Sequence, residues 1–291
     1  MVWGLGIYPI FFSRRTSLLN FLHPFIFSNF LISFGAAGLL ATGFVLVEKE
    51  FNYYALAFTF CSTLLMYNLQ RIHKLKYQTL DAKNSRHQWI IKNKKSIQFL
   101  IVICAMVLAM LIPFFHWKEV IGLFVLGVIS FFYSYKTELG NLRSLPGMKI
   151  FWIALVWAFT VSIFTVGEKI DQEDIVLFIF SFSFIVGITI PFDIRDMPYD
   201  SKSFKTIPQL IGEPASRFLA MVLIWVSFAC SSYLIGEYSI FLSLIYGIFS
   251  LIVIGSSSNR KELYYSGLMD FTLVLLFVAH YTYEQIEALH F

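Results

Sequence analysis

Long apolar segments alternate with short polar stretches along the whole chain. Nine of these segments contain about the 20 mostly apolar residues that a helix needs to cross a hydrocarbon core of roughly 30 Å. They cover residues 25–47, 52–70, 96–115, 117–135, 150–166, 174–192, 216–235, 239–255 and 267–283. The pattern predicts an all-α fold, a multi-pass transmembrane helical bundle of about nine helices in a single membrane domain over residues 1–291.

The composition excludes an ordinary soluble protein. Of the 291 residues, 58% are hydrophobic and 14% are charged, whereas soluble domains carry roughly 25% charged residues. The three cysteines, Cys61, Cys104 and Cys230, lie inside apolar segments without metal-ligand spacing, so we interpret them as buried hydrophobic residues. The net charge of +4 does not indicate nucleic-acid binding, because in a membrane protein the position of the basic residues matters more than their sum. We expect membrane lipids around the chain and no nucleic-acid partner.

The basic residues fall largely on one side of the predicted bundle. Of the 22 Lys and Arg residues, only Lys49, Lys118 and Lys169 lie on the outer face when the N-terminus is inside. The positive-inside rule therefore predicts a cytoplasmic N-terminus and a C-terminus on the opposite side, in the inner membrane if the chain is bacterial. The segment 1–20 is then cytoplasmic or interfacial, and the cytoplasmic loops are 71–95, 136–149 and 193–215.

Three carboxylates stand at the inner end of the sixth predicted helix, on an otherwise basic face. At about 100° per helical residue, Asp193, Asp196 and Asp200 fall within about 60° of one another, whereas Arg195 points nearly opposite. Such a set suits Mg²⁺, which proteins usually hold with one or two carboxylates, water and substrate phosphates. Pro198 predicts that the helix ends before Asp200. The structural alternative is a solvated acidic helix end.

These residues resemble a known family. Asp193-Ile-Arg-Asp196-Met-Pro-Tyr-Asp200, followed by Lys205-Thr206-Ile-Pro-Gln-Leu-Ile-Gly212, is similar to the second aspartate-rich motif and loop of the UbiA superfamily of intramembrane prenyltransferases. The resemblance implies that Asp193, Asp196 and Asp200 are catalytic metal ligands. Their Mg²⁺ would bind a prenyl diphosphate, whose prenyl group then alkylates a lipophilic acceptor, with aromatic acceptors among the candidates. Phe204 stands where the family has glycine.

The first aspartate-rich motif of the family is degenerate in this chain. Asn68 is kept, but Leu69, Ile72 and Lys76 occupy the expected carboxylate positions. Arg71 follows Asn68 by three residues and shares its helix face, so both are predicted to meet the diphosphate directly.

The resemblance adds further cations on the diphosphate side, namely Arg143, Lys149, Arg195 and Lys205. Ordinary positive-inside charge and lipid phosphate are the alternative explanations for such residues. Asp270, near the inner end of the ninth predicted helix, is either functional, as intramembrane ionisable groups often are, or reaches to the interface.

The leading prediction is therefore a UbiA-like, Mg²⁺-dependent integral membrane prenyltransferase. Loss of the first carboxylates favours an alternative, a non-catalytic relative that binds an isoprenoid or quinone. A transporter that uses the aspartates as a cation or proton site is the third hypothesis. Asp196→Asn is expected to abolish Mg²⁺-dependent diphosphate release in the first case.

Overall fold

The computed structural model describes residues 23–77, 85–134, 147–167, 169–198 and 205–289. All regular elements in these ranges are helices, which confirms the predicted all-α fold. They are α2 (Phe30–Leu46), α3 (Tyr53–Tyr77), α4 (Ser85–Lys92), α5 (Lys94–Leu111), η1 (Ile112–Phe114), α6 (Trp117–Ser134), α7 (Lys149–Thr165), α8 (Gln172–Asp196), α9 (Ile207–Ile235), α10 (Ile240–Ile254), η4 (Tyr264–Met269) and α11 (Asp270–Ala288).

Each of the nine predicted segments coincides with one long helix, α11 together with the π-helical turn η4 forming the last. Three described helices are long and apolar enough to cross a membrane by length and composition: Lys94–Phe114, Gln172–Asp196 and Ile207–Ile235. Further apolar helices, such as α2, α7 and α10, are shorter. Together with the mean hydropathy of +0.72, these helices support an integral membrane protein.

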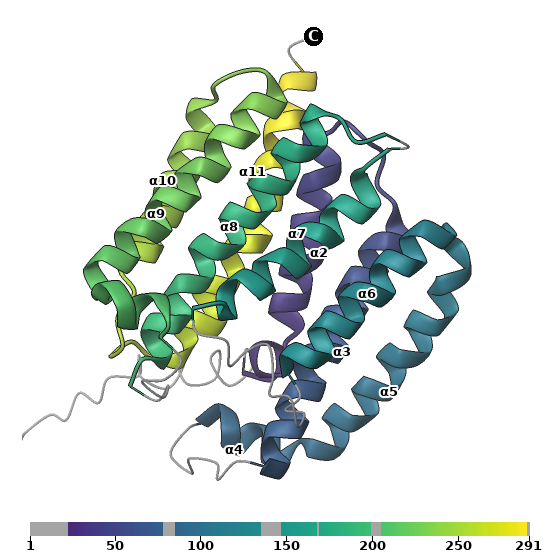
Figure 1. Cartoon of the computed structure of the whole chain (residues 1–291), viewed down its shortest axis with the longest axis vertical. Coiled ribbons are helices and arrows are strands. Elements are labelled where there is room, and N and C mark those ends of the chain that lie inside the picture. The colour runs from purple at the N-terminus through teal and green to yellow at the C-terminus, as the bar shows by residue number, and fades with distance from the viewer. Residues whose placement is uncertain (1–22, 78–84, 135–146, 168, 199–204, 290–291) are drawn as a thin grey trace, which may run out of the picture.

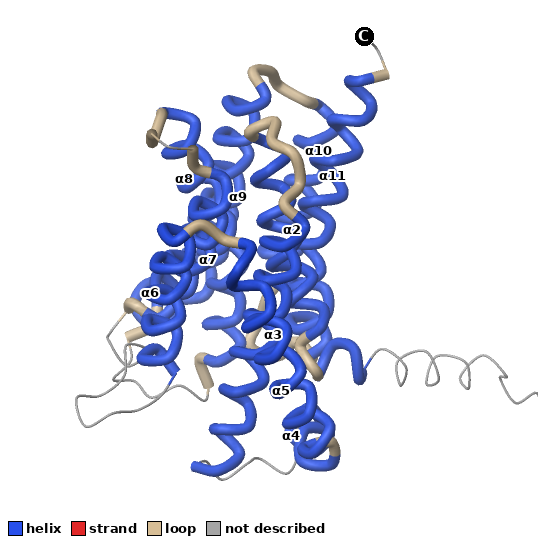
Figure 2. Tube along the Cα trace, turned by 90° about the vertical axis from the view of Figure 1, so that its right-hand side faces the viewer, coloured by secondary structure: helices blue, strands red, loops and turns tan. Residues whose placement is uncertain are grey.

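The long helices run side by side in one bundle (Figures 1 and 2). The short helix α4, which the hydrophobic pattern did not predict, lies at the lower end of the bundle in both views, and the end of α11 lies at the upper end. Contacts described below bring the last turn of α8 and the first residue of α7 to the end where α4 lies.

Small residues let α2 and α11 approach closely. A Cβ atom at Gly35 would stand 2.8 Å from the Cβ atom of Leu273, and one at Gly38 would stand 3.2 Å from the Leu273 carbonyl oxygen. Membrane helices commonly use glycine at such contacts because van der Waals packing drives their association. The close approach places α11 against α2, where both help to wall the cavity described below.

Several helices end or are interrupted at the end of the bundle where α4 lies. α8 ends at Asp196, two residues before Pro198, as predicted from the restriction that proline places on the preceding helix. α9 is interrupted at Gly212, where φ is +79°, and Pro214 follows. Asn29 also has a positive φ of +67° and separates a short helical turn from α2. A positive φ is uncommon for a residue with a side chain and is often found at functional sites.

Candidate functional site

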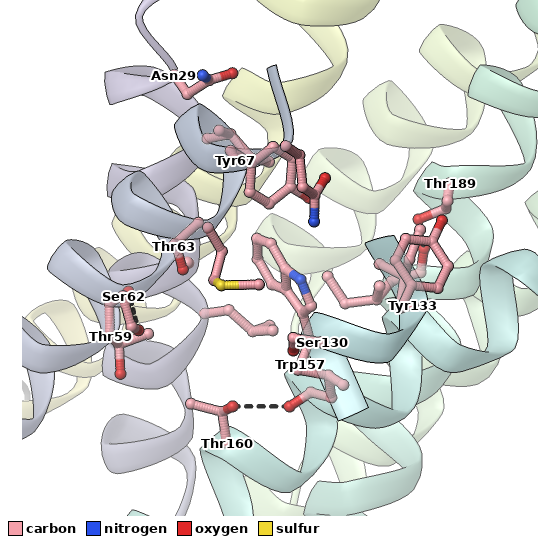
Figure 3. Close-up of a pocket in the computed structure, with 18 of the residues that line it drawn as sticks. Asn29, Thr59, Ser62, Thr63, Tyr67, Ser130, Tyr133, Trp157, Thr160 and Thr189 are labelled. Atoms are coloured by element: carbon pink, nitrogen blue, oxygen red, sulfur yellow. Dashed lines mark hydrogen bonds between the residues drawn. The ribbon is translucent and has the colours of Figure 1, made fainter. Parts of the chain in front are cut away.

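A cavity of about 450 Å³ lies between α2, α3, α6, α7, α8 and α11, within the usual range of about 300–1,000 Å³ for ligand sites. Most of its wall is apolar or aromatic. Tyr67, Tyr133 and Trp157 stand around the space together with hydroxyl groups such as Thr160 and Thr189 (Figure 3). Such a wall suits an extended hydrocarbon ligand.

Charged side chains from five helices also line this cavity. They are Arg71 of α3, Arg86 of α4, Lys149 of α7, Asp193, Arg195 and Asp196 of α8, and Asp270 of α11. Five of these residues were predicted as site residues from the sequence. The fold thus brings Arg71 of the degenerate first motif, Lys149, and Asp193 and Asp196 of the second motif to one cavity.

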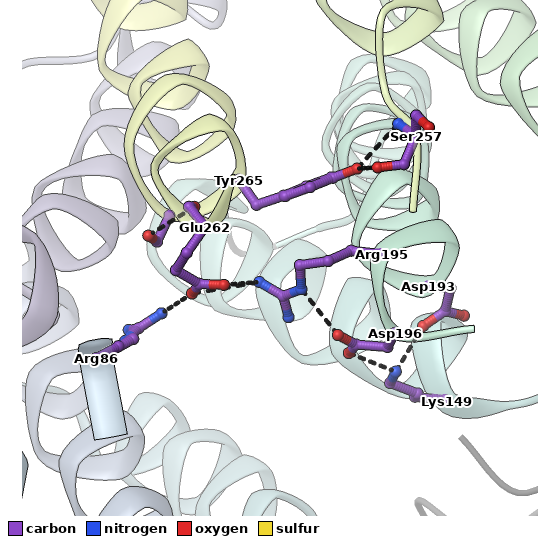
Figure 4. A network of polar contacts seen from close by, with 9 residues as sticks. Arg86, Lys149, Asp193, Arg195, Asp196, Ser257, Glu262 and Tyr265 are labelled. Carbon is purple, nitrogen blue, oxygen red and sulfur yellow. Dashed lines mark hydrogen bonds and ion pairs between the residues drawn. The ribbon is translucent and has the colours of Figure 1, made fainter. Parts of the chain in front are cut away.

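Lys149 lies between the two described aspartates of the second motif (Figure 4). Its Nζ atom is 2.6 Å from Asp193 Oδ1 and 3.5 Å from Asp196 Oδ2. The geometry follows from the sequence, because Asp193 and Asp196 are three residues apart on the last turn of α8 and face the same way. Lys149 is the first residue of α7, where a cation is unfavourable for the helix dipole. The two carboxylates offset that cost.

Arg195 turns toward Asp196, and the prediction that it points away from this aspartate is wrong. Its Nε atom donates to Asp196 Oδ1 at 2.8 Å, and its guanidinium lies 3.3 Å from Glu262 Oε2. The backbone direction is as expected for adjacent helical residues, but the long side chain bends back across the rings of Phe192 and Tyr265. Asp196 and Glu262 thus supply two carboxylates to this guanidinium.

Arg86 is a site residue that sequence reasoning missed. It donates to Glu262 Oε1 at 2.9 Å and to Asn29 Oδ1 at 2.8 Å (Figure 4 shows the first contact). Glu262 thus joins Arg86 of α4 to Arg195 of α8. The sequence offered little signal, because Arg86 is one of eight basic residues between 71 and 95 and lies 176 positions from Glu262.

Asn68 supports Arg86 indirectly, through Asn29, and lies behind the cavity wall. It does not line the cavity and is 1% exposed. Its amide accepts from Asn29 Nδ2 at 3.0 Å and donates to the carbonyl oxygens of Ser28 and Leu64 at 2.9 and 2.8 Å. The contacts run from Asn68 through Asn29 to Arg86. We therefore regard Asn68 as a residue that positions Arg86, rather than as the direct diphosphate ligand expected from the motif.

Arg71 faces the cavity beside Arg86. It follows the predicted transmembrane segment 52–70 directly. Repulsion by Arg86, together with burial, lowers the pKa of Arg71 to about 9. The direction of this shift indicates a local excess of positive charge, which an anion at this place would relieve.

The remaining predicted residues are placed differently. Lys205 is exposed, has a positive φ of +45° and does not line the cavity. Arg143 and Asp200 lie outside the described residues. Asp270, by contrast, lines the cavity and is 9% exposed, so its side chain does not reach out to the interface. It directly follows the π-helical turn η4, and such turns are frequent at functional sites.

The described residues do not fit a metal site bridged from two sides. Among them, no three His, Cys, Asp or Glu side chains come together in a group that could hold a metal ion. Asp193 and Asp196 contact the Lys149 ammonium instead. On the first-motif side, Arg71 and Arg86 stand at the cavity wall. The donor set near the cavity is therefore a mixture of carboxylates and cations.

Comparisons with solved structures show what this fold resembles. A UbiA homologue from Archaeoglobus fulgidus bound to GPP and Mg²⁺ is 13% identical, with a TM-score of 0.57 over 90% of this chain and 96% of that chain. The same homologue bound to DMAPP and Mg²⁺ gives a TM-score of 0.56 at 13% identity over the same shares, and it has also been solved with Cd²⁺.

A digeranylgeranylglyceryl phosphate synthase is 16% identical, with a TM-score of 0.55 over 91% of this chain and 97% of that chain. No protein-family model and no curated protein matches the sequence. At these identities the similarity establishes the fold. The resemblance inferred from the second motif is confirmed at that level, across nearly the whole chain.

Proposed function

We propose that this chain, with its UbiA-type fold, is an integral membrane prenyltransferase that transfers the prenyl group of a prenyl diphosphate to a lipophilic acceptor. One observation carries the proposal: a mostly apolar cavity within the bundle is also lined by Arg71, Arg86 and Lys149. The apolar wall suits the prenyl chain, and the cations suit its diphosphate. The neighbours solved with GPP and DMAPP support this substrate class.

The chain's own residues would act mainly by charge and by exclusion of water. When the bond between C1 of the prenyl group and the diphosphate oxygen breaks, the electron pair leaves with the oxygen. Fixed cations aimed at that oxygen stabilise the developing charge. Aromatic walls such as Trp157 and Tyr67 attract the allylic cation, and the apolar cavity protects it from water. The acceptor then forms a bond to C1 and loses a proton.

In this proposal Asp193 and Asp196 orient cations. Asp193 fixes Lys149, and Asp196 contacts both Lys149 and Arg195. Mg²⁺ dependence follows from the family resemblance and is supported by neighbours solved with Mg²⁺ and Cd²⁺. The contacts of Lys149 with both aspartates argue against a metal ion bound by these carboxylates.

A specific observation also favours the second candidate, a non-catalytic protein that binds an isoprenoid or quinone. The carboxylates that resemble the family's catalytic ligands already contact cations of the chain. Binding alone would require the apolar cavity but no ionisation of the ligand. The two functions differ in one measurable step, the release of diphosphate.

The test uses the full chain in nanodiscs, incubated with prenyl diphosphates of several lengths and a lipid extract of the host, with and without Mg²⁺. Diphosphate release is measured together with mass analysis for a prenylated product. Arg71→Met should lower release strongly, whereas Lys118→Met, an exposed lysine at the start of α6, should leave it unchanged. Binding without release would favour the non-catalytic function, and no binding of any prenyl diphosphate would refute the prenyltransferase. Ion flux in proteoliposomes that is independent of prenyl diphosphates would indicate a transporter.

A further inference from the structure

We infer that cations of this chain take the place of the divalent metal, so that the site binds a diphosphate in the absence of Mg²⁺. The inference rests on the proposed function for the identity of the ligand. It concerns what neutralises the diphosphate, which the comparisons do not address for this chain. It contradicts the Mg²⁺ dependence that the family resemblance implies.

The first step is the charge on the α3 side of the cavity. A metal bridge needs carboxylates there, because Mg²⁺ is a hard cation that prefers oxygen ligands. This chain places Arg71 and Arg86 at the wall instead. Arg86 is held by Asn29 and Glu262 at 2.8 and 2.9 Å, so its guanidinium has a fixed position. An arginine in a fixed position contacts phosphate oxygens directly and with two parallel hydrogen bonds.

The second step is the α8 side, where an ammonium group lies in contact with both aspartates. Lys149 Nζ contacts Asp193 Oδ1 and Asp196 Oδ2, and Arg195 contacts the other oxygen of Asp196. A divalent ion that used these carboxylates would have to displace Lys149. The side chains of Asp193 and Lys149 are only 2% and 13% exposed, so separating them leaves a buried charge without its partner, which is costly.

The third step is the balance of charge around the cavity. The described carboxylates of the network and the cavity wall are Asp193, Asp196, Glu262 and Asp270, and the described cations are Arg71, Arg86, Lys149 and Arg195. Carboxylates that outnumber the cations would need a metal ion before an anion could bind. Here the four described carboxylates are equalled in number by the four described cations. Arg86 and Arg195 even share the single carboxylate of Glu262, which leaves the arginine side attractive for an anion.

The experiment measures binding of inorganic pyrophosphate and of GPP to the full chain in nanodiscs of zwitterionic lipid. Titrations are run in EDTA and in Mg²⁺. We expect the two dissociation constants for each ligand to agree within about threefold, a difference of well under 1.4 kcal/mol. Binding of GPP only in Mg²⁺ would overturn the inference and leave the proposed function intact. Absence of GPP binding in both conditions would overturn both.

Lys149 offers a sharper second test. Lys149→Met removes the ammonium from between the two carboxylates and should lower pyrophosphate affinity in EDTA by about tenfold or more. The same variant should gain a site for Mn²⁺, detected by electron paramagnetic resonance, whereas the wild type and Lys149→Arg should bind no Mn²⁺ there. Thermal unfolding checks that each variant is folded. Equal Mn²⁺ binding by the wild type and Lys149→Met would contradict the inference.

Discussion

Replacement of Asn68 by leucine separates a positioning role from a direct contact with the ligand. Asn68 is buried, and its amide makes three hydrogen bonds, one of which holds Asn29. Asn29 in turn accepts from Arg86. Leucine has a similar size but cannot hold Asn29. The structure therefore predicts that Asn68→Leu weakens anion binding through Arg86, although Asn68 itself does not line the cavity.

The contacts give the magnitudes. Arg86→Met should weaken pyrophosphate binding by about 30-fold, because a hydrogen bond to a charged group contributes about 1.5–3 kcal/mol. Asn68→Leu should weaken it by about fivefold, since Arg86 keeps its ion pair with Glu262 while losing the support of Asn29. Asn68→Leu should also lower the free energy of unfolding by about 1.5–4.5 kcal/mol, from three buried hydrogen bonds at about 0.5–1.5 kcal/mol each.

The double variant decides between the two roles. If Asn68 acts through Arg86, the double variant Asn68→Leu with Arg86→Met should bind about as weakly as Arg86→Met alone, a coupling of about 1 kcal/mol. Isothermal titration calorimetry with pyrophosphate measures all four proteins, and thermal unfolding shows that each is folded. Independent effects, with the double variant weakened by about 150-fold, would show that Asn68 contacts the ligand itself and would refute the positioning role.

Three further predictions concern packing, charge and the apolar wall. Gly35→Ala should lower the thermal unfolding temperature, because its Cβ would stand 2.8 Å from that of Leu273; the matched control Gly247→Ala, with nothing within 4 Å, should be neutral or slightly stabilising, and equal effects would contradict the close packing. Asp270→Asn removes a negative charge from the wall and should tighten pyrophosphate binding in EDTA by about fivefold; weaker binding in calorimetry would show that the carboxylate supports the site in another way. Trp157→Ala should weaken GPP binding by about tenfold and leave pyrophosphate unchanged, and a parallel loss for both ligands would place the prenyl chain elsewhere.

Much of the fold could be predicted because transmembrane helices carry a strong local signal, a long apolar run. The nine segments and the end of α8 before Pro198 follow from single stretches of sequence. The turn at Asn29 and the helix α4 could not be predicted in this way. Asn29 lies inside an apolar segment, and its positive φ accompanies contacts with Asn68 and Arg86 that are distant in sequence. Helix α4 has only eight residues, and the charged residues in and around it leave no long apolar run that would predict a helix.

The site was predictable only where a motif marked it. Asp193 and Asp196 stand out because their spacing places them on one helix face, and Lys149 was predicted through the family resemblance. Arg86 and Glu262 have no such mark, since their roles arise from an ion pair between distant parts of the chain. Angular reasoning also misplaced the head group of Arg195, because helix geometry fixes where a side chain begins and not where a long one ends.

The two departures from the family pattern are linked by charge. Arginine near the first-motif position brings positive charge to one side of the cavity, and Lys149 matches the carboxylates on the other side. Acids introduced at Leu69 and Ile72, with Lys149 unchanged, would compete with an anion for Arg71 on the same helix and would leave Asp193 and Asp196 in contact with Lys149. With Arg71 and Arg86 present and Lys149 removed, Asp193 would lose its described partner in a buried position. The present combination avoids both costs. The cations on the first-motif side and Lys149 therefore depend on each other for the charge balance of the cavity. Restoring acids at Leu69 and Ile72 alone should lower diphosphate affinity in EDTA and should not recover a metal-bridged site.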